Sequence, residues 1–211
     1  MKLEKRIHHN HCLICFNDIR FNSLFAFINR HKYICSSCFK LLEPEFKVMK
    51  LDKVKLVSFY KYDKIKTLIY QYKGLYDIEL SKVFLDPYLL LLKILYKDYF
   101  IIPIPSSKKS DQERGFNHVY EIAKLLSNKI INCLEKNYDF KQSSLSKKER
   151  ENMKNKYIIN QDINLVFNKK ILLFDDIITS GSTLKYCISL IEKYHPKKIA
   201  CLTISYGEYK Q

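Results

Sequence analysis

Residues 171–183 read Ile-Leu-Leu-Phe-Asp-Asp-Ile-Ile-Thr-Ser-Gly-Ser-Thr, and this stretch decides the fold. Ile171 to Phe174 form a short apolar run, which is typical of a strand covered on both faces in a parallel sheet. From Leu184 the apolar residues recur with a helical period, at Cys187, Ile188, Ile191 and Tyr194. The sequence therefore predicts a strand that ends in two adjacent carboxylates, a small hydroxyl-rich loop and a helix, as in an open α/β sheet.

The loop between this strand and this helix has the composition of a phosphate site. Its residues are Thr179, Ser180, Gly181, Ser182 and Thr183. Their backbone N–H groups and hydroxyls would face an anion, with the positive end of the helix dipole behind them, and the glycine would allow a close approach. Asp175 and Asp176 suit ribose hydroxyls and a magnesium-bound pyrophosphate. The alternative is that the acids merely end a buried strand and the loop merely caps a helix.

Length and composition limit the class of protein. With 211 residues, 47% hydrophobic and 14% aromatic, the chain can bury one sizeable core and leaves about 50 residues for an appendage. The amino terminus is charged and lacks an apolar segment, so we expect no secretory signal. The longest apolar run, Val83 to Tyr96, is too short to span a bilayer and is predicted to form a buried helix. We therefore expect a cytoplasmic protein.

Four of the 7 cysteines form two close pairs. Cys12-Leu-Ile-Cys15 and Cys35-Ser-Ser-Cys38 are separated by 19 residues, a spacing typical of a structural zinc site with four thiolate ligands. Such a site needs none of the nearby histidines at positions 8, 9, 11 and 31. A redox CxxC is the alternative, but a redox enzyme needs only one pair. The other cysteines lie in apolar surroundings and are expected in the core: Cys133, Cys187 and Cys201.

A second anion site is predicted after the strand that begins at Phe100. Pro105 is followed by a polar, basic loop, Ser106, Ser107, Lys108 and Lys109. Arg114-Gly-Phe-Asn117 then opens a helix. The basic residues are mostly lysines, and the only arginines after Arg30 are Arg114 and Arg150. An arginine in such a chain suggests the planar fork that phosphate recognition uses. The alternative for Arg114 is a capping or salt-bridge role.

The segment 141–170 is polar and basic, and it precedes the strand with the two aspartates. We expect a flexible loop over about 141–165 that acts as a lid, or else a solvated helix without function. The formal net charge is +15, and residues 1–53 (ten basic, five acidic) and 141–170 (eight basic, three acidic) account for +10 of it. This asymmetry favours a nucleic-acid surface, for which we expect single-stranded DNA as the partner. The alternative is a generally Lys-rich composition whose positive charge has no function. Candidate contacts are Lys147, Lys148, Lys154 and Lys156.

The ordered set of motifs resembles the ComF family. After the two CxxC pairs it runs through Lys73-Gly74, Pro103-Ile-Pro, Arg114-Gly-Phe-Asn117, Gln142-x-x-Leu145, Glu149-Arg150 to Asn152, and the Asp-Asp loop. The resemblance covers nearly the whole chain. It implies a type I phosphoribosyltransferase-like fold, an α/β fold with a mostly parallel sheet flanked by helices, and a small N-terminal zinc-ribbon or knuckle domain. We therefore expect a zinc domain over residues 1–50 and a phosphoribosyltransferase-like domain over 51–211.

The resemblance also implies site residues and partners. Residues 171–183 would bind phosphoribosyl pyrophosphate with Mg, the loop after Pro105 would bind its pyrophosphate, and the catalytic residues would be Asp175 and Asp176. The full set implied for this ligand is Asp175, Asp176, Thr179, Ser180, Gly181, Ser182, Thr183, Ser106, Ser107, Lys109, Arg114 and Arg150. The family is implicated in DNA uptake during natural transformation. Candidate partners are thus uptake proteins at the inner face of the membrane, where a cytoplasmic protein would be peripheral.

The chain departs from the family pattern at a few positions. Lys109 stands where arginine is usual, His118 where glutamine is usual, and Ser180 where threonine is common. Asp111 and Glu113 interrupt a run that is often basic. These changes leave the loop from Thr179 to Thr183 intact. They do not decide whether the protein catalyses a reaction. We expect a DNA-handling protein that binds phosphoribosyl pyrophosphate. The alternatives are a nucleotide-salvage phosphoribosyltransferase, whose acceptor the sequence does not identify, and a ligand-sensing regulator without turnover.

Overall fold

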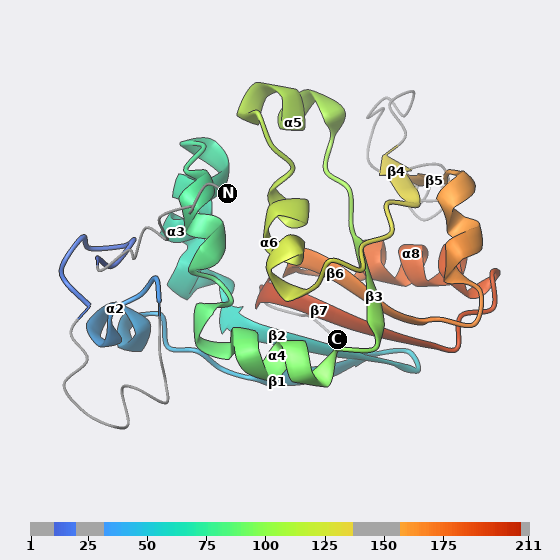
Figure 1. The fold of residues 1–211 in the computed structure, drawn as a ribbon, viewed down its shortest axis with the longest axis horizontal. Helices are drawn as coiled ribbons and strands as arrows, with labels where there is room; N and C mark the ends of the chain where they lie inside the picture. Colours follow the sequence, from blue (N-terminus) through green and yellow to red (C-terminus); the bar gives the residue numbers. More distant parts are fainter. Residues whose placement is uncertain (1–10, 20–31, 137–156, 208–211) are drawn as a thin grey trace, which may run out of the picture.

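The computed structural model describes residues 11–19, 32–136 and 157–207. Five strands form the main sheet in the order β1-β2-β7-β6-β3. Their bounds are Lys47–Leu51 for β1, Val54–Lys61 for β2, Tyr99–Pro103 for β3, Lys170–Ile178 for β6 and Lys198–Tyr206 for β7. β1 pairs antiparallel with β2, and all other pairs are parallel (Figure 1). The mostly parallel α/β sheet predicted from the sequence is therefore confirmed.

Helices cover both faces of the sheet. One face carries α3 (Tyr62–Gly74), the 3-10 helices η1 (Ile78–Lys82) and η2 (Asp86–Tyr88), α4 (Leu89–Leu95) and α6 (His118–Leu126). The other carries α8 (Ser182–Glu192), the 3-10 helix η4 (Gln161–Val166) and a small sheet of β4 (Leu134–Lys136) and β5 (Tyr157–Ile159). Two further helices are α2 (Ser36–Leu41) and α5 (Lys108–Arg114). The cysteines predicted to lie in the core, Cys133, Cys187 and Cys201, are fully buried on the α8 face.

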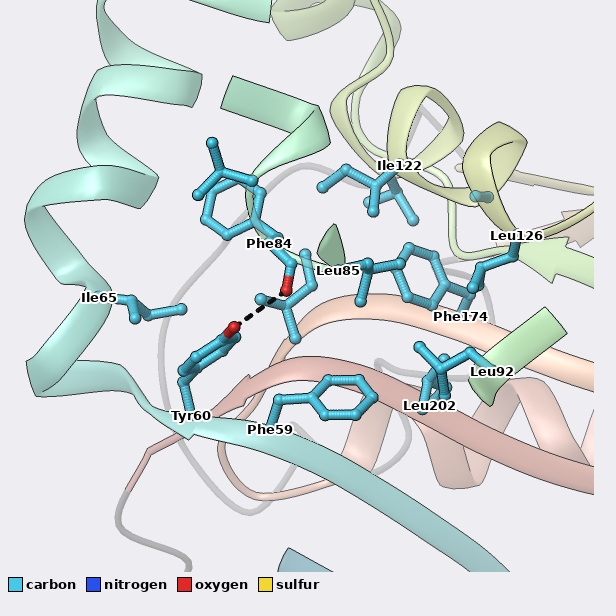
Figure 2. Packing of buried hydrophobic residues seen from close by; sticks show 14 of the residues in the cluster. Phe59, Tyr60, Ile65, Phe84, Leu85, Leu92, Ile122, Leu126, Phe174 and Leu202 are labelled. Atoms are coloured by element: carbon cyan, nitrogen blue, oxygen red, sulfur yellow. Dashed lines mark hydrogen bonds between the residues drawn. The ribbon is translucent and has the colours of Figure 1, made fainter. Parts of the chain in front are cut away.

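Figure 2 shows the core under α3 and α6. The side chains of Phe59, Phe174 and Leu202 from three neighbouring strands pack there with residues of the helical layer. The hydroxyl of Tyr60, which is fully buried, donates to the carbonyl of Phe84 over 3.2 Å. That bond matters because an unpaired buried hydroxyl costs about 1–3 kcal/mol. Each large apolar side chain buried here stabilises the fold by about 1.5–3 kcal/mol.

The strand that carries the two aspartates is longer than the sequence suggested. The prediction that it ends at Asp175 and Asp176 was wrong, because β6 continues to Ile178. Its pairing with β7 extends past the carboxylates, with Ile178 opposite Tyr206. Both aspartates therefore stand on rigid strand backbone.

The prediction of one buried helix over Val83 to Tyr96 was also wrong. Pro87 lies in the 3-10 helix η2, and the α-helix begins only at Leu89. Of the residues of α4, only Leu92 is buried. Its exposed apolar side chains are Leu90, Leu91, Ile94 and Leu95. In the part of the chain that the structure describes, no helix is both long and apolar enough to cross a membrane.

The cysteine-rich N-terminal segment packs onto the same core. Cys12, Ile34 and Cys38 are buried in the cluster that also contains Phe59. The backbone N–H of Tyr33 donates to Oδ2 of Asp86 over 3.0 Å, and the Asp86 side chain is buried. Burial raises the pKa of Asp86 to about 6, against the lowering effect of backbone N–H donors from Tyr33 and its neighbours. This carboxyl group joins the segment to η2.

We predict that Asp86 makes stability depend on pH. Its folded-state pKa of about 6 lies above the ordinary value of 3.8, so the folded chain binds this proton more tightly than the unfolded chain. The contribution is complete below about pH 4 and is lost as pH rises through about 6. Asp86→Asn does not titrate. In urea denaturation, the wild type should lose free energy of unfolding relative to this variant over that window, whereas a difference independent of pH would contradict the assignment.

Candidate functional site

The two predicted anion loops leave the sheet at the same edge. β3 and β6 are parallel neighbours, with Pro103 opposite Phe174. The N–H of Ile104 donates to the carbonyl of Phe174 over 2.8 Å, which extends the contact beyond the strand. The segment after β3 and the loop after β6 therefore meet at the carboxyl edge, where open α/β sheets bind ligands.

Asp176 lies at the centre of a buried charged cluster at this edge. Its carboxylate, 9% exposed, forms an ion pair with the ammonium of Lys73 at the end of α3. Nε2 of His118, the first residue of α6, lies 3.6 Å from Oδ2 of Asp176. Asp175 is half-buried, and its Oδ1 accepts the backbone N–H of Asp176 over 2.9 Å. The structure thus brings together side chains from α3, α6 and β6.

The surroundings set the charges of this cluster. Burial lowers the pKa of Lys73 to about 8, and Arg114 lowers it further while Asp175 acts in the opposite direction. Burial also lowers the pKa of His118 to about 2, with help from the charges of Lys73 and Arg114. His118 is therefore neutral near pH 7, and its approach to Asp176 is not an ion pair. The charge that balances Asp176 is the Lys73 ammonium.

The guanidinium group of Arg114 contacts neighbouring groups of the protein. Its Nη1 donates to Oδ1 of Asp111 and lies the same 3.1 Å from Nδ1 of His118. Its Nε donates to the carbonyl of Lys73 over 3.2 Å, and the side chain is 9% exposed. Because Nδ1 of neutral His118 accepts from the guanidinium, the ring proton is assigned to Nε2, which faces Asp176. The structure places Arg114 in the salt-bridge role that the sequence had left as the alternative.

The segment after Pro105 forms a helix where we expected a loop. α5 begins after Ser107, whose Oγ accepts the backbone N–H of Ser110 over 3.1 Å as an N-cap. The hydroxyl of Ser106 donates to Asp111. Lys109, in the first turn, is exposed. The expectation was wrong because the capping serine and the helix-forming residues that follow it were interpreted only as an anion loop.

The loop between β6 and α8 retains the features of an anion site. Gly181 is the N-cap of α8, in the left-handed region with φ of 73°, and has no side-chain cap hydrogen bond. The first turn contains no acidic residue. Thr179, Ser180 and Ser182 are exposed, and the Oγ atoms of the two serines are 2.8 Å apart. An anion here would meet hydroxyls and the positive end of an 11-residue helix.

The four cysteines form a compact cluster. Their Sγ atoms all lie within 4.8 Å of one another, and those of Cys15 and Cys35 are 3.7 Å apart. A tetrahedral zinc ion with Zn–S bonds of about 2.3 Å holds its sulfur atoms about 3.8 Å apart. Backbone N–H groups donate to Sγ of Cys12 and of Cys35. Against the effect of burial, backbone N–H donors lower the pKa of Cys12 to about 7. Donor type and spacing are therefore compatible with one structural zinc ion.

Of the N-terminal histidines, His11 is the one that lies within the described residues. His11 pairs with Asp18 over 2.8 Å, and both side chains are exposed. The histidines at positions 8, 9 and 31, Arg150, the predicted DNA contacts (Lys147, Lys148, Lys154 and Lys156) and most of the 141–165 loop lie outside the described residues. The end of that loop forms β5 and the start of η4.

Sequence reasoning missed Lys73 and His118 as site residues. Lys73 was noticed only within a Lys-Gly pair, and His118 only as a departure from a family pattern. A lysine that follows a buried tyrosine at the end of an amphipathic helix was the available signal for Lys73. Nothing in the sequence indicated that Lys73 meets Asp176, which lies 103 positions away.

Comparison with known proteins indicates the class to which this protein is similar. Residues 114–210 match the phosphoribosyl transferase domain family. Competence protein ComFC of Bacillus subtilis (strain 168) is 29% identical over 151 residues, which cover 70% of this chain and 62% of the relative. Competence protein ComFC of Streptococcus pneumoniae (strain ATCC BAA-255 / R6) is 31% identical over 140 residues, which cover 66% of this chain and 62% of the relative. The aligned part thus spans 62% of each curated relative.

A similarity to a solved structure was also found. The hypoxanthine phosphoribosyl transferase of Trypanosoma cruzi is 12% identical, with 60% of this chain and 64% of that chain covered and a TM-score of 0.38, too low to support an argument. The parallel sheet, the domain match and the cysteine cluster define a phosphoribosyltransferase-like protein with a candidate zinc centre. With the two ComFC relatives, they support a place for the chain in the ComF family.

We predict about one zinc ion per purified chain, because four thiolates close a single tetrahedral site. Cys35→Ser should loosen the first 40 or so residues, since structural zinc contributes on the order of 10 kcal/mol to small domains. Elemental analysis and limited proteolysis of both proteins measure this. Cys133→Ser, a buried cysteine outside the cluster, is the control and should retain its zinc. A metal-free, folded wild type with reduced cysteines would contradict the prediction.

Proposed function

We propose that the chain binds phosphoribosyl pyrophosphate with Mg²⁺ at the carboxyl edge and acts on single-stranded DNA during natural transformation. The match to the phosphoribosyl transferase domain and the two ComFC relatives support this proposal. The observation that carries it is the succession of Asp175, Asp176 and the start of α8 on one strand-loop-helix unit, where the N-cap is a glycine and Ser180 accepts the N–H of Ser182. The proposal includes a zinc domain over 1–50 and a phosphoribosyltransferase-like domain over 51–211.

Each part of the ligand has a suitable group at this edge. The carboxylates of Asp175 and Asp176 would accept ribose hydroxyls, and the loop from Thr179 to Thr183 would hold the 5′-phosphate. Lys109 is exposed on α5, in the segment assigned to the pyrophosphate. Magnesium would neutralise the pyrophosphate and share its oxygen ligands with a carboxylate. Hydroxyls, carboxylates and helix N–H groups are the donor set that this ligand needs.

Lys73 adds a role that the family resemblance did not assign. In the free protein its ammonium balances Asp176. We propose that a ribose hydroxyl takes its place at the carboxylate when the ligand binds, and that the ammonium turns to the pyrophosphate. Lys73 is partly exposed, with 28% of its side-chain surface accessible, so it can reach a ligand without unfolding.

The domain match also favours a second function, nucleotide salvage. A salvage enzyme would transfer the phosphoribosyl group to a nitrogen acceptor and release pyrophosphate, with Asp175 and Asp176 stabilising positive charge that develops on the ribose. A regulator would bind the ligand without releasing pyrophosphate. Calorimetry with the ligand and Mg²⁺, followed by a pyrophosphate-release assay over a panel of nucleobases, separates these functions. Absence of ligand binding would refute the proposed function.

We predict that Asp176→Asn weakens binding of phosphoribosyl pyrophosphate by about 1–3 kcal/mol, the scale of a lost charge-assisted hydrogen bond. Asp98→Asn is the matched control, because Asp98 is an exposed carboxylate just before β3, at the other end of the sheet. Isothermal calorimetry measures both affinities, and circular dichroism checks the fold. Wild-type affinity in a folded Asp176→Asn variant would mean that the aspartate does not touch the ligand.

A pH titration tests Lys73. Its charge is present below a pKa of about 8 and is lost above it. If the ammonium contacts the pyrophosphate, affinity should fall as pH rises from about 7 to about 9. Lys73→Met should bind the ligand weakly and with little pH dependence. Lys73→Arg stays charged, so its affinity should not fall over this pH range. A wild-type affinity that stays flat over this range would exclude the contact.

A further inference from the structure

Lysines gather at the amino edge of the sheet, opposite the Asp176 cluster. Because β2, β7, β6 and β3 are parallel, their first residues lie at one edge. In Figure 1 the arrowheads of β2 and β7 point to the left, so this edge lies to the right. Segments 97–99, 129–130, 167–170 and 197–199 hold six lysines and one acidic residue. We call the lysines the amino-edge surface: Lys97, Lys129, Lys169, Lys170, Lys197 and Lys198.

The backbone holds these lysines in fixed positions. Lys170 and Lys198 are register partners on β6 and β7. The N–H of Lys197 donates to the carbonyl of Lys169 over 2.8 Å, so the loops before the two strands are also joined. Neighbouring strands lie about 4.8 Å apart. Like charges directly opposite each other destabilise a sheet, and an anionic partner would relieve that repulsion.

Acidic groups compensate little of this charge. Nζ of Lys170 lies 3.4 Å from Oδ2 of Asp98, and Asp98 is the one acidic residue of these segments. Lys169, Lys197 and Lys198 are exposed. By contrast, the carboxyl edge pairs its cations with Asp111 and Asp176. The amino edge therefore suits an extended polyanion.

Aromatic rings accompany the lysines. The Nζ atoms of Lys129 and Lys169 lie 6.0 Å and 5.5 Å from the centroid of the Phe100 ring. Phe167, two residues before Lys169, is 65% exposed. Proteins that bind single strands combine basic residues along the backbone with aromatic rings on which bases stack. An anionic membrane would use the lysines but would offer no base to stack.

We propose that the amino-edge surface binds the backbone of single-stranded nucleic acid, with a base stacked on Phe167. The inference rests on the DNA-binding part of the proposed function and deepens it by naming a surface. That surface lies at the opposite end of the strands from Asp176. Single-stranded DNA and phosphoribosyl pyrophosphate therefore bind at the same time and do not compete.

The experiment compares two charge-matched triple variants of the full chain. One replaces Lys169, Lys197 and Lys198 with Gln. The other replaces Lys64, Lys66 and Lys124 with Gln. These three lysines are exposed on α3 and α6. Fluorescence anisotropy of a labelled DNA strand of about 20 nucleotides is measured at several salt concentrations. The first variant should flatten the slope of log affinity against log salt by up to about 2 units, and the second should leave it unchanged.

A single substitution and a vesicle control complete the test. Phe167→Ala should weaken DNA binding about tenfold without changing the salt slope. Asp176→Asn should leave both the DNA affinity and its salt slope unchanged. Equal slopes in the two triple variants would overturn the amino-edge surface alone, whereas a wild type without DNA affinity at low salt would overturn the DNA part of the proposed function as well. Loss of binding to phosphatidylserine vesicles in the first triple variant, with DNA binding intact, would assign the surface to membranes instead.

Discussion

The ion pair between Lys73 and Asp176 holds the candidate site together. A buried carboxylate without a partner is costly, and a buried pair contributes little net stability, so its effect is to fix positions. The Lys73 carbonyl accepts from Arg114, which also contacts Asp111 and His118. Through these contacts α3, α5, α6 and β6 meet at one point. The phosphate loop follows directly from the same strand, so its position depends on this arrangement.

The fold was largely predictable because its signals are local. The apolar run before Asp175 and the helical period after Leu184 predicted a strand and a helix, and β6 and α8 confirm them. The charged cluster was not predictable, because Lys73 meets Asp176 across 103 positions and no periodicity records such a pair. The rarity of arginine suggested a phosphate fork at Arg114. In the structure its Nε and Nη1 are bound within the protein, and the phosphate contact stays a prediction.

The sheet separates two kinds of surface. At the carboxyl edge, cations are paired with carboxylates and a helix start offers N–H groups, which suits a compact phosphorylated ligand. At the amino edge, lysines face each other on paired strands with little compensation, which suits a long polyanion. The cysteine-rich segment packs on the core that also contains Phe59, and the hydrogen bond from Tyr33 to Asp86 joins it to η2. Under the proposed function, one scaffold would thus keep two anionic ligands apart.

The most direct test of this account is an NMR titration of the Lys73 ammonium, with and without phosphoribosyl pyrophosphate and Mg²⁺. The resonance is assigned through its loss in Lys73→Arg. In the free protein the pKa should lie near 8. With ligand bound it should rise by about one unit or more, because the ammonium then faces an anionic pyrophosphate. A pKa that stays the same in the saturated complex would show that Lys73 never leaves Asp176 for the ligand.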